Sequence, residues 1–131
     1  MKTFLKYQRL TILWALFIFI MCNADFGSTG KSHLFFPGFD KLVHCGFFFM
    51  LALLSGNGYI RQQNSGALSY KAATAIITIA ILYGGIIELL QLWVFTWRGA
   101  EWGDLFADTV GIGMAIFSIL VTTGAVKYVK K

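Results

Sequence analysis

The feature that most constrains the fold is a series of four apolar segments, at residues 10–22, 42–55, 72–95 and 105–126. About 20 helical residues cross a bilayer core that is about 30 Å thick. The third and fourth segments reach this length, and the first two reach it when flanking residues are included. Only 13% of the residues are charged, against about 25% in an ordinary soluble domain, so the chain is expected to lie in lipid.

Four such segments in 131 residues predict one all-α domain, an integral membrane four-helix bundle over residues 1–131. The approximate spans are 8–24, 40–58, 72–95 and 104–126. Residues 56–70 are rich in Gly, Asn and Ser, which is typical of a polar connector. We therefore expect this stretch to link the second and third spans.

The first segment has a second interpretation as a signal peptide. Basic residues precede an apolar stretch and the small residue Ala24 follows it, as at a cleavage site. A retained helix is the favoured interpretation, and cleavage after Ala24 is the alternative. Cys22 and Cys45 lie in or beside apolar segments, where cysteine usually acts as a small hydrophobic residue. Neither a disulfide between them nor a structural zinc site is expected.

The basic residues indicate how the bundle is oriented. Three lie near the N-terminus, two lie between the second and third segments and three lie at the C-terminus, which makes eight of the 11. These are Lys2, Lys6, Arg9, Arg61, Lys71, Lys127, Lys130 and Lys131. Because short loops rich in Lys and Arg stay in the cytoplasm, both termini are expected to be cytoplasmic.

The acidic residues are distributed even more unevenly, because none of the six lies in a segment predicted to be cytoplasmic. They are Asp25, Asp40, Glu88, Glu101, Asp104 and Asp108. Trp93, Trp97 and Trp102 gather at the same outer end, as expected of an interfacial aromatic belt. The outer end of the bundle is therefore predicted to be acidic and aromatic.

Glu88 and Gln91 interrupt the third apolar segment near its outer end. A carboxylate at the centre of a membrane costs about 2.5–3.5 kcal/mol or more, so Glu88 must face the bundle interior or a wet cavity. Gln91 follows at i+3 on the same face, and Gly84 and Ala80 continue that face inward. Since small residues allow helices to approach closely, this face is expected to pack against neighbouring helices.

The second and fourth segments repeat this arrangement. Asp104 and Asp108 are four residues apart on one face of the fourth helix, as are Asp40 and His44 on the second helix. A stripe of small residues adjoins the acidic pair and comprises Gly103, Ala107, Gly111 and Ala115. Three helices thus place polar groups at one depth, which predicts an outward-facing polar site with the polar residues of the third helix as its floor.

Each polar residue also has a purely structural interpretation. Glu88 can form a structural ion pair, for which the candidate partners are His44, Lys41 and Arg98. Asp104 can cap the fourth helix. Asp108 lies one turn deeper, where capping does not explain it. The convergence of three helices favours a functional site over these single-residue interpretations.

Three stretches of the chain carry a family resemblance. They are DKLVHCGFFFMLALL at 40–54, ELLQLWVFTWR at 88–98 and DLFADTVGIGMA at 104–115. Together they resemble the VanZ-like family of small bacterial membrane proteins, named after a teicoplanin-resistance accessory protein. The resemblance covers about residues 37–116, and its pattern falls on Asp40, Lys41, His44, Glu88, Gln91, Arg98, Asp104, Asp108 and Gly111. The family commonly has Asn where this chain has Asp108.

The resemblance implies a multi-pass protein of the bacterial cytoplasmic (inner) membrane that acts in the cell envelope. It supplies no reaction. Because the predicted site opens at the outer leaflet, we expect it to bind or process a lipid-linked or glycopeptide-related envelope molecule. The expected partner is therefore the lipid bilayer and its contents, and not nucleic acid.

Two sets of candidate residues follow. The catalytic candidates are His44, Glu88, Asp104 and Asp108, and the substrate-binding candidates are Asp40, Lys41, Gln91 and Arg98. A histidine and a carboxylate can act as acid and base, while basic side chains can hold a phosphate. The same carboxylates and imidazole can instead hold a divalent metal. No hydrolase motif such as Gly-x-Ser-x-Gly or HExxH is present.

Non-enzymatic roles stay open beside these. An accessory protein would use the same cavity to capture a head group, and a scaffold would use the charged residues as an ion-pair network. A small transporter is less favoured, because the inner half of each helix lacks polar residues for a relay.

Overall fold

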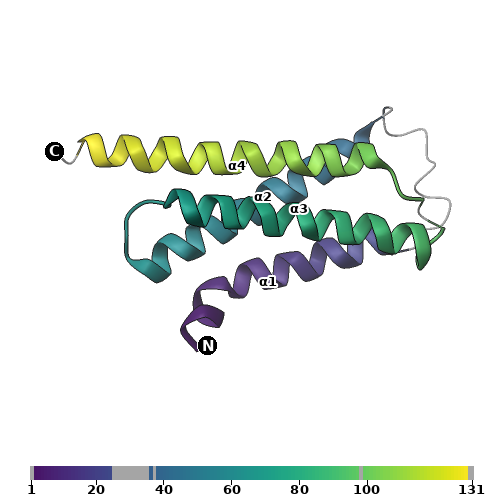
Figure 1. The fold of residues 1–131 in the computed structure, drawn as a ribbon, viewed down its shortest axis with the longest axis horizontal. Helices are drawn as coiled ribbons and strands as arrows, with labels where there is room; N and C mark the ends of the chain where they lie inside the picture. Colours follow the sequence, from purple (N-terminus) through teal and green to yellow (C-terminus); the bar gives the residue numbers. More distant parts are fainter. Residues whose placement is uncertain (1, 25–35, 37, 98, 130–131) are drawn as a thin grey trace.

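The computed structural model describes residues 2–24, 36, 38–97 and 99–129, which form four helices (Figure 1). They are α1 (Lys2–Asn23), α2 (Phe39–Gln63), α3 (Tyr70–Trp93) and α4 (Trp102–Val129). Each is long and apolar enough to cross a membrane, over Phe4–Asn23, Phe39–Gln63, Tyr70–Trp93 and Trp102–Val126. The predicted all-α, four-helix architecture is confirmed, and the approximate spans lie on these helices.

Each helix contributes one large, almost fully buried residue to the centre of the bundle. These residues are Ile18, Phe48, Ile87 and Ile112, none more than 1% exposed. Large apolar residues such as Leu13, Ile79 and Phe117 are instead more than 60% exposed on the outer faces. The bundle thus has an apolar outer surface as well as an apolar core, which suits a protein surrounded by lipid.

Small residues set the closest helix contacts. The most extensive interface joins α2 and α4. At Gly111 of α4, an added Cβ would collide with the carbonyl oxygen of Cys45 on α2. At Gly84 of α3, an added Cβ would lie 2.8 Å from Asp108 Oδ2 on α4. The faces predicted to be small are therefore the faces on which backbones and buried polar groups meet.

Two side-chain hydrogen bonds attach α1 to the other helices. Trp14 Nε1 donates to the carbonyl oxygen of Phe47 on α2, at 3.0 Å. Tyr83 on α3 donates its hydroxyl proton to the carbonyl oxygen of Ala15, at 2.6 Å. Bonds of this kind join neighbouring helices in membrane bundles. Helix α1 therefore packs against both α2 and α3 through its polar side-chain contacts as well as its apolar face.

The predicted connector at residues 56–70 is wrong over its first half, because α2 continues to Gln63. An added Cβ at Gly56 would lie 2.5 Å from Ile119 Cδ1 on α4, and one at Gly58 would lie 2.8 Å from Gln8 Nε2 on α1. These glycines therefore permit close helix packing and do not form a turn. The helix ends at Asn64, whose φ of 48° is left-handed, a conformation that asparagine tolerates better than most residues.

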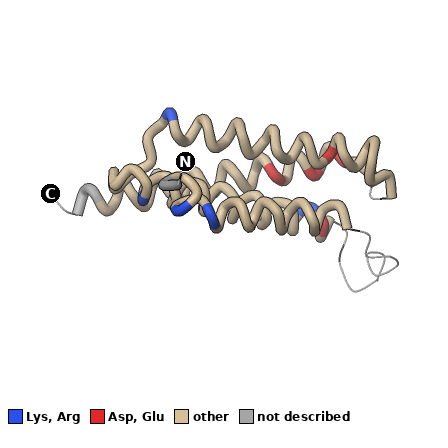
Figure 2. The backbone as a smooth tube through the Cα atoms, turned by 90° about the horizontal axis from the view of Figure 1, so that it is seen from below, with Lys and Arg blue, Asp and Glu red and all other residues tan. Residues whose placement is uncertain are grey.

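Charge separates along the long axis of the bundle. Figure 2 shows the acidic residues gathered toward one end. Described basic residues at the other end lie in the first turns of α1 and α3 and the last turn of α2, and include Lys6, Arg61 and Lys71. Lys41, at the start of α2, is the described basic residue that lies among the acids. The fold thus has one basic and one acidic end.

Candidate functional site

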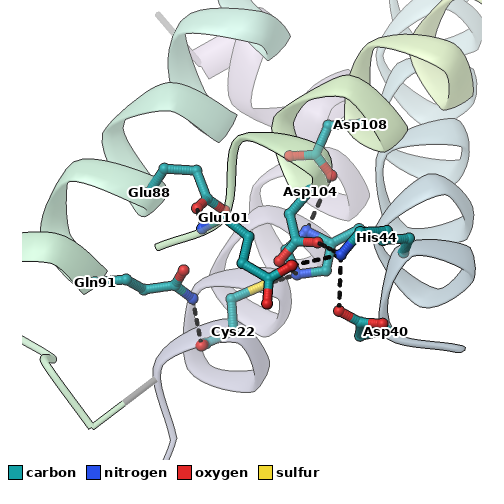
Figure 3. Close-up of polar contacts among 9 residues, drawn as sticks. Cys22, Asp40, His44, Glu88, Gln91, Glu101, Asp104 and Asp108 are labelled. Atoms are coloured by element: carbon teal, nitrogen blue, oxygen red, sulfur yellow. Dashed lines mark hydrogen bonds and ion pairs between the residues drawn. The ribbon is translucent and has the colours of Figure 1, made fainter. Parts of the chain in front are cut away.

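A cluster of buried polar side chains lies at the acidic end, where α1 and α3 end and α2 and α4 begin (Figure 3). His44 is 4% exposed, Glu88 3%, Gln91 2%, Asp104 7% and Asp108 1%. They come from α2, α3 and α4, the three helices from which the sequence predicts a site. The structure therefore brings all four catalytic candidates and one binding candidate together.

The imidazole of His44 lies between the two acids of α4. Its Nδ1 is 3.1 Å from Asp108 Oδ1, and its Nε2 is 3.8 Å from Asp104 Oδ2. When Asp108 is ionised its carboxylate can only accept, and the His44 tautomer with a proton on Nδ1 then donates to it. One histidine contacts both acids because they are one helical turn apart on the same face. Nε2 also lies 3.9 Å from Cys22 Sγ of α1.

Lys41 is held by three carboxylates at the rim of the cluster. Its Nζ lies 2.6 Å from Glu101 Oε2, 3.2 Å from Asp104 Oδ1 and 3.3 Å from Asp40 Oδ2. Asp40, predicted to share a site-lining face with His44, is half exposed and pairs with this lysine. Lys41 thus ties the first turn of α2 to the start of α4, and a phosphate would have to compete with three carboxylates for it.

Glu88 accepts a backbone hydrogen bond. Its Oε2 lies 2.8 Å from the backbone nitrogen of Glu101, whereas its buried Oε1 has no hydrogen-bond partner in residues 2–24, 36, 38–97 and 99–129. Among the described residues, no basic nitrogen lies within ion-pair distance of either oxygen. The alternative of a structural ion pair with His44 or Lys41 is therefore wrong. Arg98, the third candidate partner and a predicted phosphate ligand, lies outside the described residues.

Gln91 is turned toward α1. Its Nε2 donates to the carbonyl oxygen of Cys22 at 2.8 Å, so it joins α3 to α1 within the cluster and does not bond Glu88. Sequence reasoning assigned no role to Cys22 or to Glu101. Sequence position could have indicated both, because Cys22 lies at the outer end of α1 and Glu101 directly precedes α4, at the level of the other polar groups.

The chemistry of the cluster is dominated by oxygen acceptors. Carboxylates outnumber cations, so the cluster suits hydroxyl groups, ammonium groups or a metal ion better than a bare anion. Among the described residues, two sets of three side chains have ligand atoms within 4.8 Å of one another. One set is buried and consists of His44, Glu88 and Asp104. The other is Asp40, Glu101 and Asp104, and it surrounds the ammonium group of Lys41.

The tryptophans at this end are exposed. Trp93 is 73% exposed and Trp102 is 76% exposed, on either side of the link between α3 and α4. Such residues favour the interface between lipid and water, so the cluster lies near a membrane surface. Comparison of the chain with family models, curated protein sequences and solved structures gives no match.

Proposed function

We propose that the protein is a bacterial cell-envelope membrane protein of the VanZ-like type, with both termini in the cytoplasm. Its polar cluster opens toward the outer face of the cytoplasmic membrane and binds or processes the head of a lipid-linked or glycopeptide-related envelope molecule. The observation that carries this proposal is the buried cluster of His44, Glu88, Asp104 and Asp108 at the acidic end of an apolar bundle.

Burial of these groups favours a site over a packing device. Ionisable residues inside membrane bundles are costly and usually mark a functional position. Two apolar residues would fill the space of His44 and Asp108 at no greater cost, since buried ion pairs add little net stability. The described polar residues that carry the family resemblance all lie at this one end, on α2, α3 and α4.

The geometry indicates what the cluster can do to a head group. Asp108 orients His44, so that Nε2 faces Asp104 and can accept a proton from a hydroxyl group or a water molecule. Hydroxyl and ammonium groups are frequent in sugars and peptides of envelope molecules, and the surrounding carboxylates can bind both. Arg98 is the remaining basic candidate for a phosphate.

A structural scaffold is the second candidate function, and the contacts of Lys41 favour it. One ammonium group joins Asp40, Glu101 and Asp104, which come from α2, the α3–α4 link and α4. A network of this kind can hold helix ends together without binding any ligand. The two candidate functions predict different effects of a mild substitution inside the cluster.

The experiment compares Glu88→Gln with wild type in a glycopeptide-susceptibility assay and in native mass spectrometry from mild detergent. We expect the variant to accumulate in the membrane, to lose a co-purified envelope molecule and to give the susceptibility of cells without the protein. Thr109→Val is the matched control, since Thr109 is exposed and its hydroxyl bonds only Leu105 within its own helix. Full function in Glu88→Gln would contradict the proposed site. Loss of function through failure to accumulate would favour the scaffold.

The orientation makes a separate prediction. A cytoplasm-dependent reporter fused after Lys131 should be active, and a periplasm-dependent reporter at the same position should be silent. The physical reason is the excess of basic residues at that end of the bundle. The opposite pattern would invert the topology and place the cluster at the cytoplasmic face.

A further inference from the structure

One buried carboxylate of the cluster, Glu88, has an oxygen that no donor among the described residues satisfies. Glu88 is 3% exposed; within the described part of the chain its Oε1 has no hydrogen-bond partner, while Oε2 accepts from the backbone of Glu101. A buried carboxylate oxygen without a partner is costly, and buried polar atoms are nearly always paired. This unpaired oxygen therefore indicates that a ligand binds beside it.

His44 is oriented in the way that metal-binding histidines usually are. In the tautomer that donates from Nδ1 to Asp108, which is 1% exposed, the lone pair of Nε2 faces the cluster. In metal sites, a carboxylate commonly accepts from the other ring nitrogen of a ligating histidine, fixing its tautomer and raising its basicity. Asp108 would thus be a positioning residue for His44.

Three ligand atoms converge at this place. His44, Glu88 and Asp104 each offer one, all lie within 4.8 Å of one another, and every one of the three residues is more than nine-tenths buried. Figure 3 shows them approaching from three different helices. We propose that His44, Glu88 and Asp104 form a site for one divalent transition-metal ion, with Asp108 orienting the imidazole.

The ligand set indicates which ion fits. One imidazole nitrogen with two carboxylates suits Zn²⁺ or Mn²⁺ better than Mg²⁺ or Ca²⁺, which prefer oxygen alone. Zn²⁺ is expected to bind more tightly than Mn²⁺. Zinc ligands lie about 2.0–2.2 Å from the ion, so tetrahedral ligands are about 3.3 Å apart, and only a small inward movement of the side chains is needed. Three protein ligands leave a fourth position for a ligand or water.

The ammonium group of Lys41 does not occupy the proposed metal position. Lys41 Nζ contacts Asp104 through Oδ1, whereas His44 faces Oδ2 of the same carboxylate. Asp104 can therefore bind a metal and keep its contact with Lys41. A metal here would also attract an anionic head group into an otherwise acidic cluster. The metal site itself does not depend on the proposed function, since the ion alone tests it.

The test uses the full-length protein in detergent, from which any metal has been removed with a chelator. Binding of Zn²⁺ and of Mn²⁺ is then measured by calorimetric titration. We expect one Zn²⁺ per chain in wild type and a rise in the unfolding temperature on binding. Glu88→Gln and Asp104→Asn should each weaken binding by at least about 100-fold, since even outer partners of a metal site contribute 10–100-fold. Asp108→Asn should weaken it by about 10-fold, because the amide oxygen can still accept from the imidazole but carries no charge.

Glu101→Gln is the matched control, because its side chain is largely exposed and belongs to the rim around Lys41. Its affinity should stay within about threefold of wild type, since exposed charges contribute little. The proposal is overturned if wild type binds no metal. It is also overturned if Glu88→Gln and Asp104→Asn bind as tightly as wild type, or if Glu101→Gln is as defective as they are. If one ligand variant fails to fold, the other decides the result.

Discussion

Gly111→Ala is expected to lower the free energy of unfolding by about 3 kcal/mol, at the upper end of the usual cost of overpacking. The new methyl group would collide with the backbone of Cys45, and a backbone carbonyl cannot rotate away as a side chain can. The collision falls on the α2–α4 interface, the most extensive in the bundle. The effect is measured by unfolding the detergent-solubilised protein with increasing SDS and monitoring its helix content by circular dichroism.

Gly113→Ala provides the control for this prediction. Gly113 lies on the same helix and is exposed, and apart from its own stretch of helix no described atom lies within 4 Å of the position of an added Cβ. Alanine there should be neutral or slightly stabilising, because a glycine in a helix costs about 0.5–1 kcal/mol relative to alanine. Equal unfolding curves for the two variants would contradict the proposed close contact between α2 and α4.

His44→Leu is expected to cost about 3–5 kcal/mol of unfolding free energy, because it removes one member of a buried pair. Asp108 is 1% exposed, and His44 is its hydrogen-bond partner among the described residues. The substitution would leave a carboxylate in an apolar interior. The measurement is SDS unfolding in the presence of a chelator, so that any bound metal does not contribute.

A second substitution separates the loss of the His44–Asp108 contact from the change in side-chain shape at position 44. Asp108→Asn keeps the size of the side chain and removes its charge. In the double variant His44→Leu with Asp108→Asn, about 1–3 kcal/mol of the loss should be recovered, since residues in direct contact are coupled by that amount. Additive effects would show that His44 contributes through packing alone and that its contact with Asp108 adds no stability.

The apolar segments predicted the number and type of the helices because length and hydrophobicity are local properties. Helical spacing also placed Asp104 and Asp108 on one face. The end of α2 at Gln63 was not predicted, because the predicted span stopped at residue 58 and the stretch that contains Gly56 and Gly58 resembles a turn in sequence. Their actual role is close packing against α4 and α1, a non-local property.

The site was predicted in outline from depth, but its contacts were not. Gln91 could be placed beside Glu88 by spacing, yet its donor bonds Cys22 of α1, a helix that the predicted site did not include. Likewise, Asp40 shares a helix face with His44 but pairs with Lys41 at the rim. Partners across helices depend on how each helix is rotated about its axis, which a single sequence does not reveal.

The bond from the Glu101 backbone to Glu88 offers a built-in spectroscopic reporter. The amide proton of Glu101 points at the buried carboxylate of Glu88, and Glu101 lies in the link between two helices. Because a hydrogen bond to an anion is stronger than one to a neutral acceptor, this proton should resonate at unusually low field. Any ion or head group that binds the Glu88 carboxylate should shift that resonance. The chemical shift of this one amide proton thus reports whether the cluster is occupied.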